Sequence, residues 1–271
     1  MYYLFRVLYA LGSAKLLSKM WWLFYYLDFF RKPIVYKNLD IAFPDLTPKE
    51  KTSLAKKIYK NFAKFFEDTI EYTKNPEKMN EIEIKNQEYL TDTLKSKKPV
   101  IIMSAHFGNW ELGPRLIAEK FTPLAAVMRK IENEKINNFF VKVRNHKNIK
   151  IIYRDSAAKE MLRAMLKEHL PLGILIDQYS RANQSFKVKF FKPDTVFNPA
   201  ISKIAKATGA VVIPTFSYKK NGDYVLEFKT PKTFDKDKDT IESFTQWQAD
   251  VIENIIKQHP DQYYWFHNRW K

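Results

Sequence analysis

A histidine and a carboxylate that could together move a proton stand five residues apart in the first half of the chain. The segment 104–111, SAHFGNWE, follows directly on the apolar run 100–103, VIIM. Residues five apart on a continuous helix lie about 140° from each other, so His106 and Glu111 cannot share a helical face. We therefore place His106 in a loop that leaves a strand, and Glu111 in the first turn of the following helix.

The residues between them suit this arrangement. Gly108 lets the chain bend, and Asn109 is a favourable N-cap. The geometry predicts that the Glu111 carboxylate holds one imidazole nitrogen while the other nitrogen faces a cleft. An imidazole oriented in this way is a general base for a substrate hydroxyl. The alternative is structural: His106 caps the helix, and Glu111 is a first-turn acid that stabilises the helix dipole.

The rest of the chain offers few other ways to do chemistry. It has no cysteine, which excludes thiol nucleophiles, disulfides and cysteine-ligated zinc. It contains no Gly-rich phosphate loop, dinucleotide fingerprint or nucleophile-elbow serine. The acids at 235, 237 and 239 are spaced like the start of a calcium loop, but Thr240 and Gln246 occupy its sixth and twelfth positions. We interpret this segment as a charged turn, and because no histidine pair has metal-helix spacing we predict no metal site.

Charge and length narrow the possibilities further. The 271 residues carry 46 Lys and Arg against 30 Asp and Glu, a net charge of +16, and 45% of them are hydrophobic, which is ample for a core. Such an excess of positive charge favours an anionic partner, which could be nucleic acid, anionic lipid or an acidic protein.

Hydrophobic patterning predicts an α/β fold. Apolar β-rich runs alternate with helix-length segments, which indicates a mixed, mostly parallel sheet flanked by helices, with ligands at the carboxyl ends of the strands. A Gly222-Asp223 turn between the last two runs suggests an antiparallel edge. The runs are 100–104, 124–128, 149–153, 172–176, 188–191, 211–216 and 224–228, and the helical segments are 48–74, 110–120, 133–146, 156–169, 198–208 and 240–258.

The N-terminal stretch differs from the rest. Residues 2–30 are rich in Leu, Trp, Tyr and Phe, but charges interrupt them at 6, 15, 19 and 28. The uncharged pieces fall short of the roughly 18–20 apolar residues needed to span a bilayer. Aromatic residues interleaved with Lys and Arg predict helices lying in the headgroup zone, although an aromatic helix covering the protein's own core is the alternative. We therefore divide the chain into a helical membrane-associating segment, 1–32, and a single α/β domain, 33–271.

The segment 106–111 resembles the H-x4-D/E motif of the lysophospholipid acyltransferase superfamily. More narrowly, the chain resembles the late acyltransferases of lipid A biosynthesis, the lauroyl and myristoyl transferases. The likeness extends over nearly the whole chain, because further family segments follow in the same order: Asn38-Leu39 with Ala42-Phe43-Pro44, the spaced arginines Arg129, Arg144 and Arg154, Asp177-Gln178, Phe190-Phe191, Thr208-Gly209-Ala210 with Pro214, and Trp265-x-His267-x-Arg269.

This resemblance implies a reaction and its partners. An acyl chain would pass from an acyl carrier protein thioester, with no other cofactor, to a hydroxyl of a lipid A precursor at the cytoplasmic face of the cell inner membrane. In the family, that hydroxyl belongs to a 3-hydroxyacyl chain attached to a glucosamine disaccharide. The basic surface would then serve an acidic carrier protein and an anionic membrane, and nucleic acid is not expected as a partner. His106 would remove the hydroxyl proton, and Glu111 would orient the imidazole and stabilise its charge.

The resemblance also suggests roles for further residues. The helix N-terminus after Gly108 and Asn109, together with Arg129, would stabilise the oxyanion. The guanidinium groups of Arg144, Arg154 and Arg181 could bind phosphates of the acceptor. Asp177 and Gln178 would either contact substrate or close a buried hydrogen-bond network, and for His267 and Arg269 we favour packing of the C-terminus.

Other functions remain compatible with the sequence. The same residues could acylate a glycerophosphate, an ornithine lipid or a sugar, or take the acyl group from acyl-CoA. A basic, aromatic-rich module that binds nucleic acid or a membrane surface without catalysis is a further alternative. Against that module, the chain contains no ordered nucleic-acid-binding signature.

Overall fold

A computed structural model describes residues 19, 25–27, 31–129, 134, 137, 141, 144, 147–153, 157–179 and 186–270. Most of the predicted membrane-associating segment and most of the predicted helix 133–146 lie outside these residues, as do Arg154 and Arg181. The division of the chain at residue 32 stays a prediction. Within the part that is described, no helix is both long enough and apolar enough to cross a bilayer.

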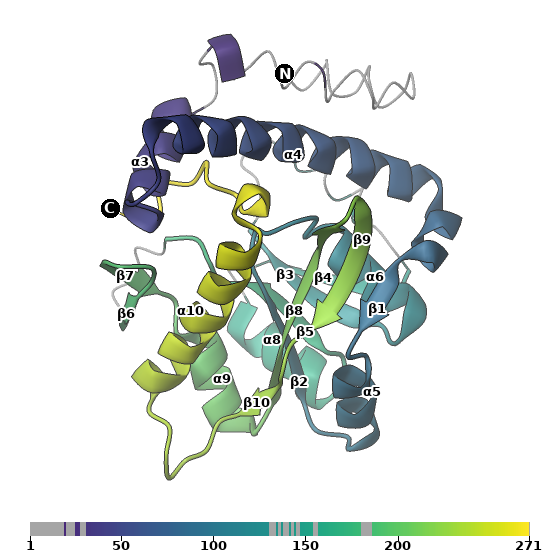
Figure 1. The fold of residues 1–271 in the computed structure, drawn as a ribbon. Helices are drawn as coiled ribbons and strands as arrows, with labels where there is room; N and C mark the ends of the chain where they lie inside the picture. The colour runs from purple at the N-terminus through teal and green to yellow at the C-terminus, as the bar shows by residue number, and fades with distance from the viewer. Residues whose placement is uncertain are drawn as a thin grey trace.

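The central sheet has eight strands and confirms the predicted mixed, mostly parallel α/β fold (Figure 1). Its order is β1-β9-β8-β2-β5-β3-β4, and β10 pairs with β8. The run from β8 to β4 is parallel throughout, whereas β9 and β10 are antiparallel to β8. The strands are β1 (Glu83–Lys85), β2 (Val100–Ser104), β3 (Leu124–Met128), β4 (Ile149–Tyr153), β5 (Leu172–Leu175), β8 (Val211–Lys220), β9 (Asp223–Phe228) and β10 (Lys232–Thr233).

The predicted hairpin between β8 and β9 forms, but its turn is Asn221-Gly222, one residue earlier than the predicted Gly222-Asp223. Asn221 and Gly222 both have positive φ, 55° and 100°, which is the backbone conformation that a tight two-residue hairpin turn requires. Strand β9 is not the edge of the sheet, however, because the three-residue strand β1 pairs with it in parallel. So short and polar a strand has no recognisable pattern in the sequence. The predicted run 188–191 also differs, since β6 (Phe186–Lys189) pairs with β7 (Asp194–Phe197) in a separate two-stranded sheet.

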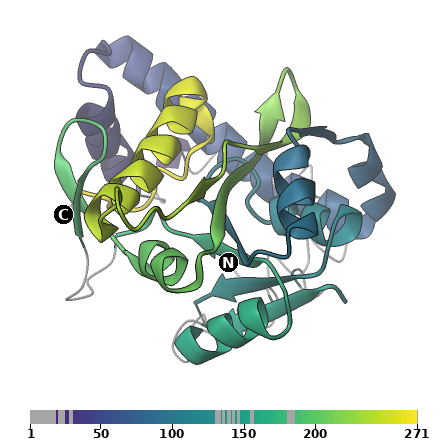
Figure 2. The same cartoon turned by 90° about the horizontal axis from the view of Figure 1, so that it is seen from below.

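Helices cover both faces of the sheet, as Figure 2 shows from below. Alternate residues of β2 explain why: Ile101 and Met103 belong to one hydrophobic cluster, and Val100 and Ile102 belong to another. The first cluster includes side chains of the helices α8 (Ala157–Leu166), α9 (Ala200–Thr208) and α10 (Ile241–Gln258), and the second includes those of α5 (Glu88–Lys95) and α6 (Leu112–Lys120).

Helix α4 (Pro48–Lys74) crosses the carboxyl ends of the parallel strands (Figure 1). A capping box stands at its N-terminus, because Thr47 N donates to Glu50 Oε2 at 2.8 Å and Glu50 N donates to Thr47 Oγ1 at 3.3 Å. Beside it, α3 (Lys32–Ala42) holds the C-terminal residues in place. The buried Asn38 amide donates to the carbonyl oxygens of Trp265 and His267, at 2.7 and 2.8 Å.

Candidate active site

The catalytic candidate His106 lies opposite Asp177, which is 71 residues away in the sequence. Strands β2 and β5 are parallel neighbours, with Ser104 paired to Leu175. Two residues beyond this pair, the Asp177 carboxylate accepts hydrogen bonds from Nδ1 of His106 at 2.8 Å and from its backbone N–H at 3.0 Å. One carboxylate therefore fixes both the imidazole and the loop that carries it.

The other imidazole nitrogen points outward. Because the ionised carboxylate can only accept, Nδ1 carries the proton and Nε2 presents a lone pair. The Gln178 amide nitrogen lies 3.3 Å from Nε2 and can donate to it. Gln178 is exposed, and 21% of the His106 side chain is accessible. A hydroxyl that replaced the Gln178 amide would meet an oriented base.

The surroundings of Asp177 keep its carboxyl ionised. Burial raises its pKa, but the electrostatic attraction to His106 and the hydrogen bonds from it outweigh that effect and hold the pKa below its usual value. Burial, together with the Asp177 charge, raises the pKa of the Tyr263 phenol far above its usual value, so Tyr263 stays neutral beside Asp177. The Asp177 carboxylate thus stays ionised and accepts the hydrogen bonds from His106.

Glu111, the predicted partner of the imidazole, binds Arg144 instead. Arg144 Nε donates to Glu111 Oε2 at 2.6 Å, and Nη2 donates to Oε1, which makes a bidentate pair. The Glu111 side chain is only 7% exposed, so the pair is largely shielded from water. The prediction that Glu111 holds the imidazole is therefore wrong. We predicted that the Arg144 guanidinium binds phosphates of the acceptor, but in the structure it forms this bidentate pair with Glu111.

The bend at Gly108 brings the His106 loop against β8. Gly108 has φ +58°, and a Cβ there would lie 2.1 Å from the carbonyl oxygen of Ser217. The backbone N–H of Gly108 donates to Gln262 O at 2.8 Å, and that of Asn109 donates to Ser217 O at 2.7 Å. Only glycine fits this approach, as the sequence indicated. The same hydrogen bonds occupy both of these N–H groups, so neither is available to an oxyanion, and the role of the helix N-terminus that follows them stays a prediction.

Asn109 caps α6 from the turn before it rather than binding substrate, and Glu111 occupies the N-cap position predicted for Asn109. Its side chain is fully buried, and Oδ1 accepts from Leu112 N at 3.2 Å, at the first residue of α6. Thr69 on α4 also donates to this oxygen at 3.3 Å. The cap therefore ties the start of α6 to α4, and the assignment of Asn109 to substrate binding is corrected.

Comparison with known proteins identifies the family of this chain. Residues 7–271 match the family described as bacterial lipid A biosynthesis acyltransferase. The chain belongs to this family. It is also 23% identical over 244 residues to the lipid A biosynthesis lauroyltransferase of Escherichia coli (strain K12), a match that covers 89% of this chain and 79% of that protein. The protein is therefore an enzyme that transfers acyl groups.

Of the remaining predicted arginines of the acyltransferase, Arg129 lies among the described residues. Arg129 is exposed directly after β3, and β5 lies between β3 and β2. Neighbouring strands are about 4.8 Å apart, so the Arg129 backbone starts roughly 10 Å to the side of the His106 loop. Its assignment to the oxyanion stays a prediction, as do the roles of Arg154 and Arg181, which lie outside the described residues.

Residues of the C-terminus support the active site, and the sequence did not reveal this. Tyr264 N donates to His106 O at 2.9 Å, and the Gln262 side chain makes two hydrogen bonds, at 2.7 and 2.9 Å, to the backbone of Lys219 on β8. His267 Nε2 accepts from Tyr179 N at 2.9 Å, next to Gln178. Only the family-like ending 265–269 hinted at a role for this segment. For Arg269, the packing interpretation is confirmed, because its buried guanidinium donates to Thr195 and Val196 and lies over the ring of Phe197.

The acidic segment 235–239 is the predicted charged turn. Asp239 accepts from Asp235 N at 3.0 Å and from Lys232 Nζ at 2.7 Å, and Asp235 accepts from Asp237 N at 3.0 Å. These contacts close the turn through its own side chains. Among the residues that the structure describes, no group of three potential metal ligands converges.

Proposed function

We propose that this acyltransferase moves a fatty acyl chain from an acyl carrier protein thioester to a hydroxyl of a lipid A precursor. The family supports lipid A biosynthesis as the setting, and the excess of positive charge suits an acidic carrier protein. The observation that carries the mechanism is the pairing of His106 Nδ1 with the buried Asp177 carboxylate, since this pairing leaves Nε2 as a base.

In the proposed reaction the acceptor hydroxyl replaces the Gln178 amide at Nε2. The imidazole takes the hydroxyl proton while the oxygen attacks the thioester carbonyl carbon. The tetrahedral intermediate then collapses, the carbon–sulfur bond breaks, and the leaving thiolate takes the proton from His106. Asp177 stabilises the imidazolium that exists between these two steps. The step needs no covalent intermediate on the enzyme.

Glu111 enters the proposal as a positioning residue for Arg144 rather than for His106. Its carboxylate holds the guanidinium through two charge-assisted hydrogen bonds at the start of α6, next to the histidine loop. A fixed guanidinium in a water-poor site stabilises negative charge more strongly than a mobile one. Loss of the Glu111 carboxylate would therefore release Arg144 without removing the partner of Nδ1.

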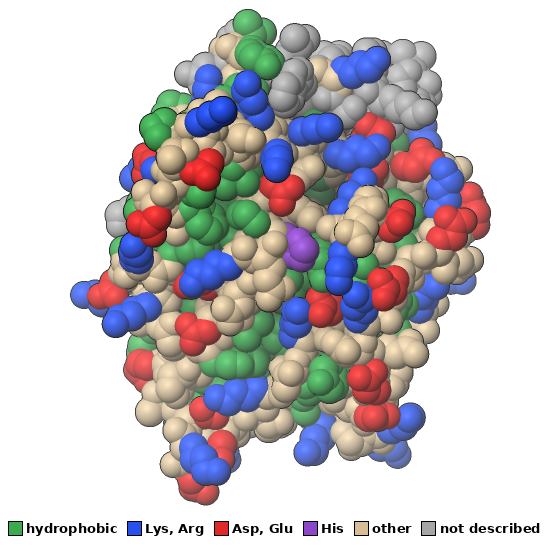
Figure 3. All heavy atoms as spheres, in the orientation of Figure 1, with side chains coloured by type: hydrophobic (Ala, Val, Ile, Leu, Met, Phe, Trp, Pro, Cys, Tyr) green, Lys and Arg blue, Asp and Glu red, His purple; other side chains and the backbone are tan. Residues whose placement is uncertain are grey.

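The surface around α4 supports a location at the cytoplasmic face of an anionic inner membrane. Figure 3 shows Lys and Arg side chains along the upper edge of the molecule, over this helix. The exposed or half-buried lysines recur at helical spacing, and Tyr26 and Leu27 nearby are 56% and 59% exposed. Cations beside exposed aromatic and apolar side chains suit a headgroup region. We define this α4 lysine stripe as Lys49, Lys56, Lys57, Lys60 and Lys64.

The test is transfer of a labelled acyl chain from acyl carrier protein to the tetra-acylated or penta-acylated lipid A precursor, read by mass spectrometry. Wild-type protein should add one acyl group, and His106→Ala should lose the activity while keeping its thermal transition. Acyl-CoA, glycerophosphate and ornithine-lipid acceptors run in parallel. Full activity of His106→Ala, or faster transfer to one of the other acceptors, would contradict the proposal.

A further inference from the structure

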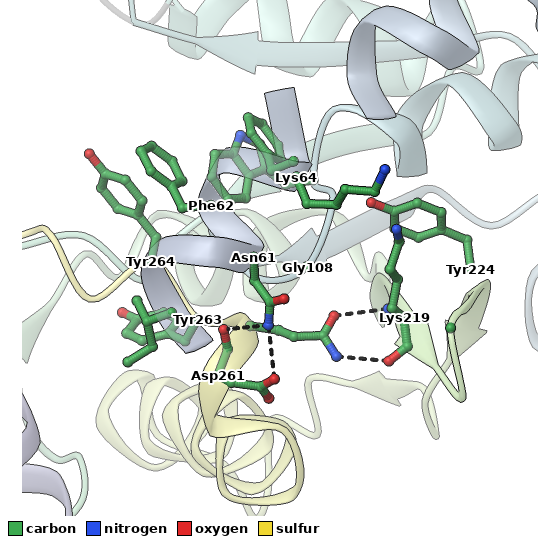
Figure 4. Close-up of a pocket in the computed structure, with 14 residues that line it drawn as sticks. Asn61, Phe62, Lys64, Gly108, Lys219, Tyr224, Asp261, Tyr263 and Tyr264 are labelled. Atoms are coloured by element: carbon green, nitrogen blue, oxygen red, sulfur yellow. Dashed lines mark hydrogen bonds between the residues drawn. The ribbon is translucent and has the colours of Figure 1, made fainter. Parts of the chain in front are cut away.

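A cavity of about 290 Å³ opens beside α4 (Figure 4). It is formed where α4 meets the β8–β9 hairpin and the 3₁₀ turn η3 (Pro260–Gln262). This volume is at the lower limit of small-ligand sites, which span about 300–1,000 Å³. The cavity has room for a sugar-sized ring and is too small for a whole lipid.

Two aromatic side chains connect the cavity with the catalytic histidine. Trp110 and Tyr264 line the cavity, and their ring centroids lie 5.2 and 6.0 Å from that of His106. Phe65 of α4 stacks on Trp110 with centroids 4.1 Å apart, which fixes the indole in place. A ligand in the cavity is therefore separated from the imidazole by about the thickness of these rings.

The lining combines aromatic surface with groups that donate and accept hydrogen bonds. Asn61 Nδ2 donates to Asp261 Oδ2 at 2.8 Å, so the remaining acceptors of both side chains stand at the cavity wall (Figure 4). On the opposite side Lys64 and Lys219 bring their ammonium groups toward Tyr224. Aromatic walls with a few convergent polar groups on both sides suit a ring that carries several hydroxyl or amide substituents.

The charges in the cavity favour a neutral ring over a bare phosphate. The buried Asp68 carboxylate binds Lys219 Nζ at 2.7 Å and Lys64 Nζ at 3.3 Å, and Tyr224 donates to it at 2.9 Å. The Asp68 carboxylate thus compensates the charges of both lysines, while the remaining N–H groups of the lysines can still donate hydrogen bonds to a ligand. An acyl chain is disfavoured, because it would displace water from the remaining N–H groups of Lys64 and Lys219 and from the Asp261 carboxylate without replacing those hydrogen bonds.

We propose that this cavity binds a glucosamine ring of the acceptor. This inference rests on the proposed function and adds to it the site at which the sugar headgroup of the acceptor binds. In a 3-hydroxyacyl sugar the reactive hydroxyl is only a few bonds from the ring. A ring held in the cavity would send that chain past Trp110 and Tyr264 to His106 Nε2. The cavity lies beside α4, so the headgroup would be bound next to the α4 lysine stripe.

Direct binding is measured by saturation-transfer NMR with the full-length protein. The probes are the glucosamine disaccharide without acyl chains, in its unphosphorylated and bisphosphorylated forms. Ring protons of both forms should receive saturation, with affinities within about threefold of each other. Asn61→Phe, which fills the cavity with a ring, should abolish the transfer. Saturation of the phosphorylated form only would identify a phosphate site and overturn the proposal, as would saturation that survives in Asn61→Phe.

Kinetics give an independent measurement. Lys219→Met should raise the KM for the acceptor about tenfold, the value of one lost charged hydrogen bond, and leave the KM for the acyl donor unchanged. Lys220→Met is the matched control, because Lys220 is the exposed next residue of β8. An unchanged acceptor KM in both Lys219→Met and Asn61→Phe would refute the sugar site alone. If the wild-type protein binds the disaccharide but acylates no lipid A precursor, the proposed function fails and the sugar site stands.

Discussion

Replacing Asp177 with asparagine tests the pairing on which the mechanism depends. In the ground state the carboxylate accepts a 2.8 Å hydrogen bond from a neutral imidazole, and in the transition state it faces an imidazolium. Charges about 4 Å apart at an effective dielectric constant near 20 attract each other by about 4 kcal/mol. A charge-assisted hydrogen bond is only about 1–2 kcal/mol stronger than a neutral one, and this difference is the lower bound on the stabilisation that Asp177→Asn removes.

A loss of about 1–4 kcal/mol of transition-state stabilisation corresponds to a fall in kcat of roughly 5- to 1,000-fold. The KM values should change little, because the charge on His106 develops only during the reaction. The assay is steady-state transfer from acyl carrier protein at saturating acceptor, with circular dichroism to verify folding. A kcat of Asp177→Asn within threefold of the wild-type value would refute the role assigned to Asp177.

Glu111→Gln is the comparison that separates the two carboxylates. Proton NMR should show the downfield Nδ1–H resonance of His106 in the wild-type protein and in Glu111→Gln, because Asp177 remains in place. The resonance should move upfield or disappear in Asp177→Asn. Activity of Glu111→Gln should also fall, through Arg144. If the resonance were lost in Glu111→Gln and kept in Asp177→Asn, Glu111 would be the partner of the imidazole after all.

Three further outcomes follow from the fold. Gly108→Ala should lower the free energy of unfolding by about 2 kcal/mol or more, because φ is positive and the new Cβ would overlap a backbone oxygen of β8. Urea titrations measure this, and an unchanged midpoint of the unfolding transition would contradict the prediction. Reversing two charges of the α4 lysine stripe, Lys57→Glu with Lys60→Glu, should weaken binding to anionic vesicles by at least about 30-fold, because each lysine removed costs roughly 1 kcal/mol. The control Lys236→Glu, at an exposed position of the turn 235–239, should leave vesicle binding unchanged. Equal effects of the two variants would exclude α4 as the docking face. Because the pKa of Asp177 lies below its unfolded value, its stabilising contribution is present above the unfolded pKa and is lost as the pH falls through the folded one. Wild-type stability should accordingly fall more steeply in acid than that of Asp177→Asn, and parallel acid titrations would contradict the ionised state.

Local features of the fold could be predicted from the sequence because neighbouring residues determine them. The capping box at Thr47 and the turn at Asn221-Gly222 each depend on a few adjacent side chains and backbone angles. The strand–loop–helix that carries His106 follows from an apolar run, a glycine and a cap within some twenty residues. The short strand β1 escaped prediction because three residues, of which only Ile84 is apolar, carry no periodicity.

The sequence by itself determined that His106 stands in a glycine-containing loop between a strand and a helix, within the order of motifs that marks this acyltransferase family. It could not determine which acid serves the imidazole. That was decided by the placement of β5 beside β2 and by the register of Ser104 with Leu175, which brings Asp177 opposite His106 across 71 residues of chain. Spacing along the sequence favoured Glu111, but hydrogen bonds depend on distance in space, and the order of strands in a sheet is fixed only when the whole chain packs.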